Sequence, residues 1–311
     1  MTSPLALRHP KDWRQLLTVV LYLSLVLGMY WVPAMRQWPV LVAACAYSFL
    51  SAVVNHNTMH LGLFASKRMN NAFRMVLSFC ALYPVSANIP SHNLVHHHFD
   101  DDGQPDWAAP EHVSFRWNLL NLLHFPNVAG PITFEGVNRW GTLRGKAEFR
   151  RQYTMESIFA FGLTGLLLLN DFWSALFYVM VPQLFGARWF LRINIIQHEG
   201  IDTRSDWNHS RNFVGRVFNW FMLNNGYHTI HHNRAGLHWS VWAEEHAKEV
   251  KPRIDPSLDE PSFLGYLART YLWTFARPAK KDFAAAERGL PSGLKSREEQ
   301  RAEAEALGAA L

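Results

Sequence analysis

The apolar stretch QLLTVVLYLSLVLGMYWVPA, residues 15–34, decides the fold. It has about the 20 residues that a membrane-spanning helix needs. A second apolar run, VLVAACAYSFLSAVV at 40–54, follows a short break that contains Pro33, Arg36 and Pro39. Because the break is so short, the two runs predict a helical hairpin whose two ends lie on the same side of a bilayer.

Two further apolar blocks predict a second hairpin. They are Ile158–Leu169 and Phe172–Phe190, and Asn170 and Asp171 form the turn between them. Residues 55–155 are mostly polar, and their one apolar run, Phe73–Ile89, is short and contains Pro84, so we expect an interfacial helix there. The predicted fold is an all-α membrane protein with four transmembrane helices in two hairpins, interfacial helices and a cytoplasmic histidine-rich cap.

Composition and charge agree with this topology. Hydrophobic residues make up 49% of the 311 residues, yet the mean hydropathy is only −0.09, so the apolar residues are concentrated in blocks. Lys and Arg are frequent in the N-terminus, in 55–155 and after Phe190, whereas the two hairpin turns carry only Arg36. The positive-inside tendency therefore predicts a multi-pass integral membrane protein with both termini in the cytoplasm. The net charge of +5 suits an anionic membrane surface and gives no reason to expect nucleic acid as a partner.

We expect two domains and no cleaved leader. The apolar run after Arg14 is long and lacks a small-residue cleavage site, which favours a first span over a signal peptide. Residues 1–250 are predicted to form the membrane domain with its cap, and 251–311 a cytoplasmic C-terminal extension. The last ~35 residues of that extension are charged and Ala-rich, a composition typical of a soluble helix.

Three histidine boxes carry the chemistry. The first, HNTMH, has His56 and His60 four residues apart, so both imidazoles lie on one face of a helix. The second, HNLVHHH, runs from His92, and the third, HTIHH, begins at His228 and repeats the spacing of three and four residues. The boxes contribute these histidines: His56, His60, His92, His96, His97, His98, His228, His231 and His232.

So many imidazoles in three boxes favour two metal ions. Buried polar groups need partners, and a metal satisfies several imidazoles at once. Zinc takes four ligands, of which three come from the protein in catalytic sites, so eight or more histidines exceed one zinc site. The two cysteines, Cys45 and Cys80, lie in apolar stretches and form no CxxC pair, which disfavours a thiolate site. Iron bound by histidines at a membrane face is the remaining choice.

The three boxes and the apolar blocks around them resemble the integral-membrane fatty acid desaturase and hydroxylase superfamily, over roughly residues 15–245. The resemblance implies a non-haem centre of two Fe ions with O₂ as co-substrate. It also implies a further ligand, His198, after the fourth span, and an asparagine, Asn194, that acts through water. The HxxxHH register of the family selects His96 and His97, so His98 is expected to be structural. The implied direct ligands are His56, His60, His92, His96, His97, His198, His228, His231 and His232.

Other polar residues are expected to play smaller parts. The remaining histidines, His9, His112, His124, His209, His238 and His246, are isolated, although His238 lies near the third box and is a candidate for orienting a ligand. A ligating imidazole usually donates its second N–H to a carboxylate or a carbonyl. The acidic candidates for this role are Asp100, Asp101, Asp102, Asp106 and Glu199, and most of the aspartates are expected to lie in a solvated loop.

The sequence predicts O₂-dependent oxidation of a lipid or fatty acyl chain, with desaturation placed first. The same boxes suit a hydroxylase, or an oxidative decarboxylase that yields a terminal alkene. No haem, flavin or iron–sulfur motif is present in the sequence, so an external electron donor of the ferredoxin, rubredoxin or cytochrome type is implied. A non-enzymatic membrane metal-binding protein is the alternative from another class. Because the boxes lie beyond the ends of the spans rather than inside them, the sequence disfavours a transporter.

Overall fold

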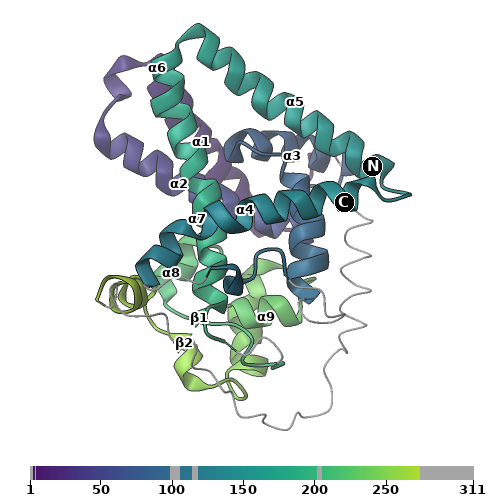
Figure 1. The fold of residues 1–311 in the computed structure, drawn as a ribbon, viewed down its shortest axis with the longest axis vertical. Coiled ribbons are helices and arrows are strands. Elements are labelled where there is room, and N and C mark those ends of the chain that lie inside the picture. The colour runs from purple at the N-terminus through teal and green to yellow at the C-terminus, as the bar shows by residue number, and fades with distance from the viewer. Residues whose placement is uncertain (1–2, 4, 99–105, 114–117, 202–204, 274–311) are drawn as a thin grey trace. The chain divides into compact units, whose positions relative to one another are not determined.

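The computed structural model describes residues 3, 5–98, 106–113, 118–201 and 205–273. The described residues are mainly helical (Figure 1) and form two compact units. Unit 1 comprises the residues up to Pro90 together with Val137–Phe190, and unit 2 comprises Ser91–Gly136 together with the described residues from Leu191 onward. The predicted division at residue 250 stays a prediction, and the predicted tail helix lies outside the described residues.

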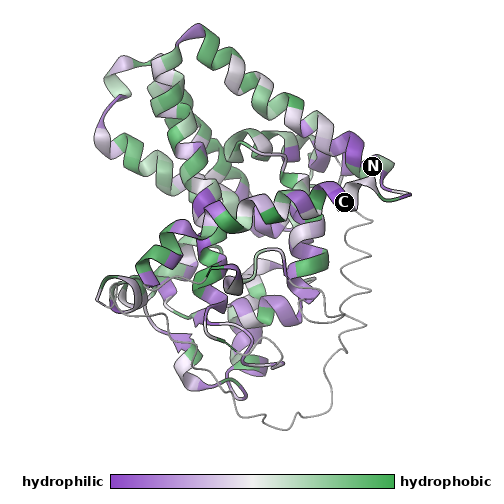
Figure 2. Cartoon of the chain, viewed as in Figure 1, coloured by the Kyte–Doolittle hydropathy of each residue, from purple (hydrophilic) through white to green (hydrophobic). Residues whose placement is uncertain are grey.

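Long helices build unit 1. They are α1 (Trp13–Trp31), α2 (Trp38–His60), α3 (Lys67–Ala81), α5 (Ala147–Asn170), α6 (Phe172–Ala175) and the first half of α7 (Val181–His198). Short turns η1 (Pro10–Asp12), η2 (Pro33–Met35), η3 (Val85–Ala87) and the π-helical turn η7 (Leu176–Met180) complete it. Figure 2 shows that α1 and α2 are largely hydrophobic, whereas α5 is hydrophilic toward its start at Ala147 and hydrophobic toward its end.

The predicted first hairpin turn has an identifiable cause. Val32 is extended, as a residue before proline tends to be, and α1 therefore ends at Trp31. The guanidinium of Arg36 then donates to the carbonyl oxygens of Met29 (3.0 Å) and Tyr30 (2.8 Å), two carbonyls that have no hydrogen-bond partner within α1 because they lie at its end.

In α7, a Cβ on Gly186 would clash with Ser48 of α2, so glycine permits a close approach of these two helices.

Two helices of the described residues are long and apolar enough to cross a membrane, namely Pro10–Trp31 and Trp38–His60. A third span is added if the bent pair Lys67–Ala81 and Val85–His98 counts as one. The bend of 99° follows α3, where Leu82 adopts a left-handed conformation with φ 56°. The single interfacial helix expected over Phe73–Ile89 is therefore wrong in detail, because this break divides it. Four spans and the cytoplasmic cap stay predictions.

The second predicted hairpin matches the structure in its break and differs in its lengths. α5 ends at Asn170, and Asp171 caps α6 by accepting a hydrogen bond from the Ser174 amide (3.1 Å). α5 begins at Ala147, well before the expected Ile158. α7 continues past the expected end at Phe190 as far as His198, which places Asn194 and His198 one turn apart on a helix.

Apart from the larger part of α4 and the end of α7, unit 2 is built from short helices and irregular segments. It contains η5 (His96–His98), η6 (Pro110–His112), α8 (Arg216–Phe221), α9 (His228–Asn233), η8 (Trp239–Val241), α10 (Trp242–Glu245), η9 (His246–Val250), η10 (Pro256–Leu258), α11 (Phe263–Leu267) and η11 (Ala268–Leu272). The π-helix η4 (Ile89–Val95), α4 (Asn118–Thr142) and α7 each contain a unit boundary. The two short strands β1 (Asn212–Phe213) and β2 (Asp259–Glu260) pair in parallel.

Candidate metal centre

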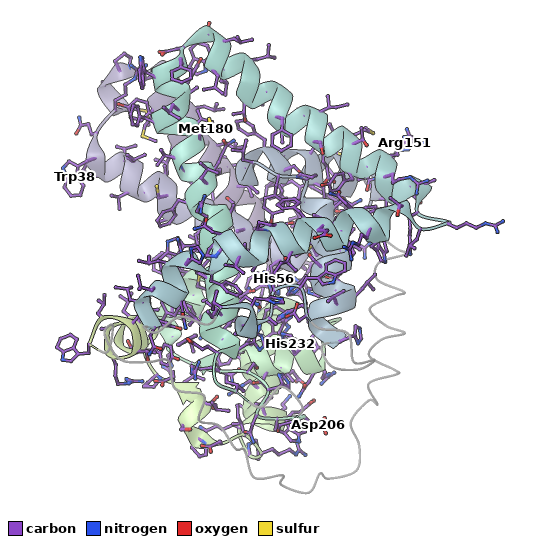
Figure 3. The ribbon with its side chains drawn as sticks, viewed as in Figure 1. Trp38, His56, Arg151, Met180, Asp206 and His232 are labelled. Atoms are coloured by element: carbon purple, nitrogen blue, oxygen red, sulfur yellow. The ribbon has the colours of Figure 1, made fainter. Side chains whose placement is uncertain are left out.

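The first histidine box lies at the end of α2. His56 and His60 are buried, and their ring centroids are 5.5 Å apart, one helical turn from each other, as the sequence predicts. Figure 3 places Trp38 and His56 toward opposite ends of this helix. The ring of Phe190 packs edge-on against His56 at 6.1 Å. The last ten residues of α2 are all buried, so this apolar helix ends in a buried polar segment whose groups require partners.

The second box is not an α-helix, which corrects the expected geometry. His92 lies in the π-helix η4, and His96 and His97 follow in the 3₁₀ turn η5. The π-helix winds more widely than an α-helix, and Nε2 of His97, two residues beyond its end, lies 3.1 Å from Nε2 of His92. The spacing of four residues predicts that His92 and His96 lie on one face, and their rings are indeed stacked, with centroids 5.1 Å apart.

The third box forms the short helix α9. His228 and His232 lie one turn apart with their Nε2 atoms separated by 3.1 Å. Thr229 fixes the helix, since its amide donates to Oδ1 of Asn212 (2.9 Å) and its hydroxyl accepts from Nδ2 of the same side chain (3.0 Å). These two bonds fix α9 to β1, and they help to explain why a helix of only six residues is well defined at this place.

Four imidazoles of unit 2 converge on one point. The ligand nitrogens of His96, His198, His228 and His232 all lie within 4.8 Å of one another, and all four side chains are buried. Nε2 of His198 is 2.9 Å from Nε2 of His228. Four nitrogen donors from three separate segments meeting in this way match the arrangement that a metal ion requires. We call these four residues the His228 group.

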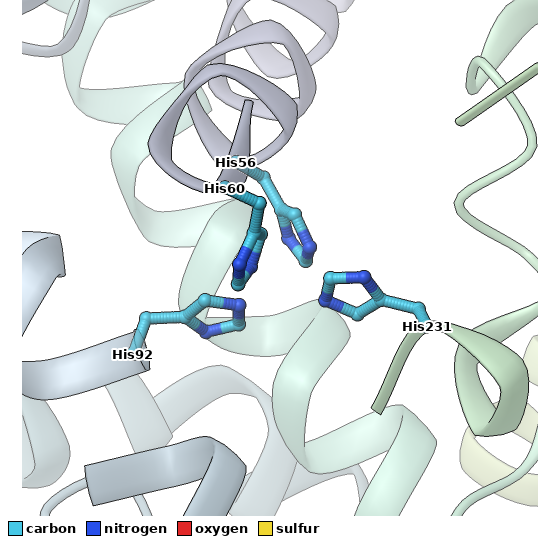
Figure 4. Close-up of side chains that lie close together, drawn as sticks. All are labelled: His56, His60, His92 and His231. Atoms are coloured by element: carbon cyan, nitrogen blue, oxygen red, sulfur yellow. The ribbon is translucent and has the colours of Figure 1, made fainter. Parts of the chain in front are cut away.

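A second convergence in unit 2 involves His97. Its Nε2 lies 3.1 Å from Nε2 of His92 and 3.1 Å from Nε2 of His231. The rings of His92 and His231 are stacked at 5.9 Å (Figure 4). The ring of His97 also stacks on His232 at 4.3 Å, so His97 connects His92 and His231 with the His228 group. Figure 4 also draws His56 and His60 on the last turns of α2.

Outer partners orient two imidazoles of the His228 group. Nδ1 of His96 is 2.7 Å from Oδ2 of Asp106, and both side chains are buried. Nδ1 of His198 donates to the carbonyl oxygen of His209 at 3.0 Å. Because a carbonyl only accepts, the proton of His198 must lie on Nδ1, which leaves the Nε2 lone pair for a metal.

Electrostatics favour neutral imidazoles at this site. Burial, followed by the nearby rings of His96 and His209, lowers the pKa of His198. Burial also lowers the pKa of His232, assisted by His97 and His228. A metal ligand must carry a lone pair rather than a second proton, so the buried cluster is prepared for a cation and not for an anion.

Asn194 is bonded to the protein backbone and lies one helical turn from a member of the His228 group. It is on α7 one turn before His198, and its Nδ2 donates to the carbonyl oxygen of Ala108 at 2.8 Å. This bond holds Asn194 against the segment that follows Asp106. Its predicted action through water stays a prediction.

His209 was missed by sequence reasoning, which treated it as isolated. It is buried, its ring is 5.4 Å from that of His232, and its Nε2 lies 2.9 Å from Oδ1 of Asn233. Its spacing along the chain gives no signal, because the contacts come from the irregular segment after α7. Nδ1 of His238 accepts from the Ser240 amide and caps η8, and its expected role in orienting a ligand stays a prediction.

Among the acidic candidates, Asp106 takes the expected role. Glu199 instead accepts a hydrogen bond from the hydroxyl of Tyr271 at 2.8 Å. Asp100, Asp101 and Asp102 lie outside the described residues. Ring contacts join His92, His96 and His97 of the second box to histidines of other segments in unit 2. The expected structural role of His98 stays a prediction.

The family model of the fatty acid desaturases matches residues 36–260. The chain belongs to the fatty acid desaturase family. The match covers all nine predicted ligand histidines. No curated protein matches the chain, and no solved structure matches it. Membership implies an oxidoreductase that acts on a lipid or acyl substrate in a membrane context, and the buried histidine groups of this desaturase family member are compatible with metal binding.

Proposed function

We propose that this chain is a non-haem di-iron enzyme that uses O₂ to desaturate a lipid or fatty acyl chain. The observation that carries the proposal is the pair of imidazole convergences in unit 2, one around His228 and one around His97. Their seven histidines exceed what one zinc ion takes, and the buried pair at the end of α2 adds two more. We assign the ligands as His56, His60, His92, His96, His97, His198, His228, His231 and His232, with Asn194 acting through water.

The chemistry of the donors fits iron. Imidazole suits iron, and the carboxylate of Asp106 and the carbonyl of His209 orient the rings of His96 and His198. Bound iron would supply the oxidising power to break an inert C–H bond with O₂. The protein's own part is to keep His198 and His232 neutral, to fix the directions of His96 and His198, and to limit the access of water by burying all four residues of the His228 group.

Two electrons must come from a separate protein, for which we propose a donor of the ferredoxin, rubredoxin or cytochrome type. Hydroxylation and oxidative decarboxylation use the same donors and remain the alternatives for the outcome. In desaturation two hydrogens leave the acyl chain, in hydroxylation one oxygen is added, and in decarboxylation the carboxyl carbon is lost.

We further propose four spans, with α5 and the α6–α7 segment as the second hairpin and both termini cytoplasmic. Support comes from the large apolar side chains that α5 and α6 expose, including Ile158 (68% exposed), Leu166 (65%) and Trp173 (65%). Exposed apolar faces of this kind suit contact with lipid tails. A reporter inserted at Asn170 should report the side opposite to that of a C-terminal reporter; the same side for both would overturn this topology.

The decisive experiment is lipid profiling. The chain is expressed with a competent electron donor in a host that lacks the activity, and new products are identified by mass spectrometry with assignment of double-bond position. We expect products that have lost two hydrogens. A gain of oxygen or a loss of CO₂ would replace desaturation with one of the alternatives.

Metal analysis of the purified protein tests the enzyme class itself. We expect about two irons per chain, the number that nine histidine ligands imply. One zinc and no iron would overturn the proposal and favour a non-enzymatic metal-binding protein.

A further inference from the structure

Helix α8 presents an apolar face to the outside of unit 2. Phe218 and Asn219 point inward, and Asn219 is 3% exposed. Val217, Trp220 and Phe221, at spacings of three and four residues, share the outward face and are 75%, 61% and 51% exposed. In a helix of a globular protein such a face is normally buried against another element.

The segment from α11 to η11 presents a similar face. Tyr266 and Tyr271 are buried, whereas Leu264, Leu272 and Trp273 are 75%, 57% and 83% exposed. The ring of Phe263 stacks on that of Phe218 at 4.7 Å, so α11 adjoins α8 directly. We call the six exposed side chains the α8–α11 patch: Val217, Trp220, Phe221, Leu264, Leu272 and Trp273.

Cations accompany the apolar side chains. Arg216 is exposed at the start of α8, and Arg269 is exposed on η11, where it pairs with Glu260 (2.7 Å) and lies over the ring of Tyr266. Short helices that combine Trp, Phe and Leu on one side with Arg nearby are typical of segments that lie in the membrane–water interface. Arginine there is attracted to anionic headgroups.

We propose that the α8–α11 patch is a lipid-binding surface that lies in the interface between headgroups and acyl chains. A bilayer is the occupant that the chain itself supplies, because α1 and α2 are long and apolar enough to cross one. Removing apolar side chains from water is favourable in proportion to the area buried, so six exposed apolar side chains on adjoining helices favour contact with lipid. The proposal does not depend on the identity of the metal or of the product.

The side chain of Asn219 connects α8, which carries part of the α8–α11 patch, to the backbone before the third histidine box. Asn219 of α8 donates to the carbonyl oxygen of Phe213 in β1 (2.6 Å), and its Oδ1 accepts from the Gly226 amide (3.0 Å). A Cβ at Gly226 would clash with Phe213 and Asn219, so the segment leading to His228 packs closely on α8. These contacts hold the segment that leads into α9 against α8, the helix that carries half of the patch.

Depth measurements on the full-length protein in lipid nanodiscs test the proposal. Single cysteines are introduced as Trp220→Cys and Leu264→Cys, with the native thiols removed by Cys45→Ser and Cys80→Ala, and are labelled with an environment-sensitive fluorophore. The matched control is Lys248→Cys, whose side chain is exposed on η9 in the same unit. The nanodiscs contain phosphatidylcholine and phosphatidylglycerol with a nitroxide on the acyl chain or on the headgroup.

We expect labels at 220 and 264 to be quenched by the nitroxide lipids and to lose quenching by aqueous iodide, and the label at 248 to show the reverse. Iodide quenching at all three positions would overturn the proposal, and so would protection from both quenchers at 220 and 264, which would indicate a protein partner. If the thiol-free background fails to fold, Trp220→Phe and Trp273→Phe are compared in brominated lipid. Each should then reduce the quenching of tryptophan emission by that lipid, and unchanged quenching in both would reject the patch.

Discussion

In unit 1, helices of 19 to 24 residues such as α1, α2 and α5 account for most of the structure; in unit 2, the helices α8 and α9 have six residues each. In the long helices most backbone N–H and C=O groups hydrogen-bond within the helix. In unit 2, side chains such as those of Asn212 and Asn219 form hydrogen bonds with backbone groups of other segments. Unit 2 also carries seven of the nine proposed ligands. The difference suggests that metal binding contributes to the order of unit 2 and much less to that of unit 1, a link known from other metalloproteins.

The largest test of this contrast is His228→Ala. His228 contacts both His198 and His232 through Nε2, so its loss should empty the His228 group. Removing a residue that hydrogen-bonds a metal ligand costs roughly 10–100-fold in metal affinity or activity. Loss of a central ligand should exceed this and reduce oxygen-dependent product formation more than about 100-fold. The measurements are iron content and product yield.

The control for this variant is His124→Ala, a histidine exposed on α4. It should keep both iron and activity, since it lies outside the boxes. If His228→Ala retained iron and product at the level of the control, the assignment of ligands would fail, and so would the contrast between the two units.

Glu156→Ala tests what holds unit 1. Glu156 is fully buried in α5 and accepts hydrogen bonds from the amide (2.8 Å) and hydroxyl (2.7 Å) of Ser86 and from Gln152 (2.8 Å), with the guanidinium of Arg74 at 3.6 Å. Removing one partner of a buried ion pair costs about 3–5 kcal/mol, because the other charge is left uncompensated. We expect a destabilisation of this size in denaturant titrations followed by helix content.

Two comparisons interpret that result. Glu148→Ala removes an exposed carboxylate of α5 that pairs with Lys67 of α3, and should change stability by no more than about 1 kcal/mol. The double variant Arg74→Met with Glu156→Ala should recover part of the loss. A single Glu156→Ala variant as stable as Glu148→Ala would show that the buried cluster does not hold unit 1 together.

The same contrast governs how much the sequence predicts. Apolar length and proline positions locate α1, α2 and the break at Asn170 because unit 1 is dominated by local helix formation. They miss α4, since Pro126 and Pro131 lie inside it and its residues are not apolar enough to stand out. In unit 2 the spacing identifies the boxes. It does not predict the π-helix that contains His92, or the contact of His209 with Asn233, which depends on packing between segments that are apart in the chain.

Asp106→Asn sharpens the comparison at one outer partner in unit 2. The substitution keeps the size of the side chain but replaces the carboxylate that faces Nδ1 of His96 at 2.7 Å. We expect iron affinity to fall roughly 10–100-fold, measured by competition with a chelator and accompanied by a smaller loss of product. Asp255→Asn, at the cap of η10, is the control and should leave iron affinity unchanged. Equal iron loss in both variants would show that Asp106 does not orient His96.

The smallest expected effect separates stability from metal binding by a matched pair, one tyrosine in each unit. The hydroxyl of Tyr271 donates to Glu199, the residue after His198, and that of Tyr30 donates to the carbonyl oxygen of Leu167, both at 2.8 Å. Burial, and next the carboxylate of Glu199, raises the pKa of Tyr271, so its phenol stays protonated and keeps donating. Each substitution to Phe should cost about 0.5–1.5 kcal/mol.

Only Tyr271→Phe should also weaken iron binding, because it releases the segment next to a ligand, whereas Tyr30→Phe should lower stability alone. The readouts are the denaturation midpoint and the chelator concentration that removes half of the iron. If the two variants changed iron binding equally, the coupling between the order of unit 2 and its metal would not be local. The residues around Tyr271 would then behave as the separate extension that the sequence predicts from residue 251.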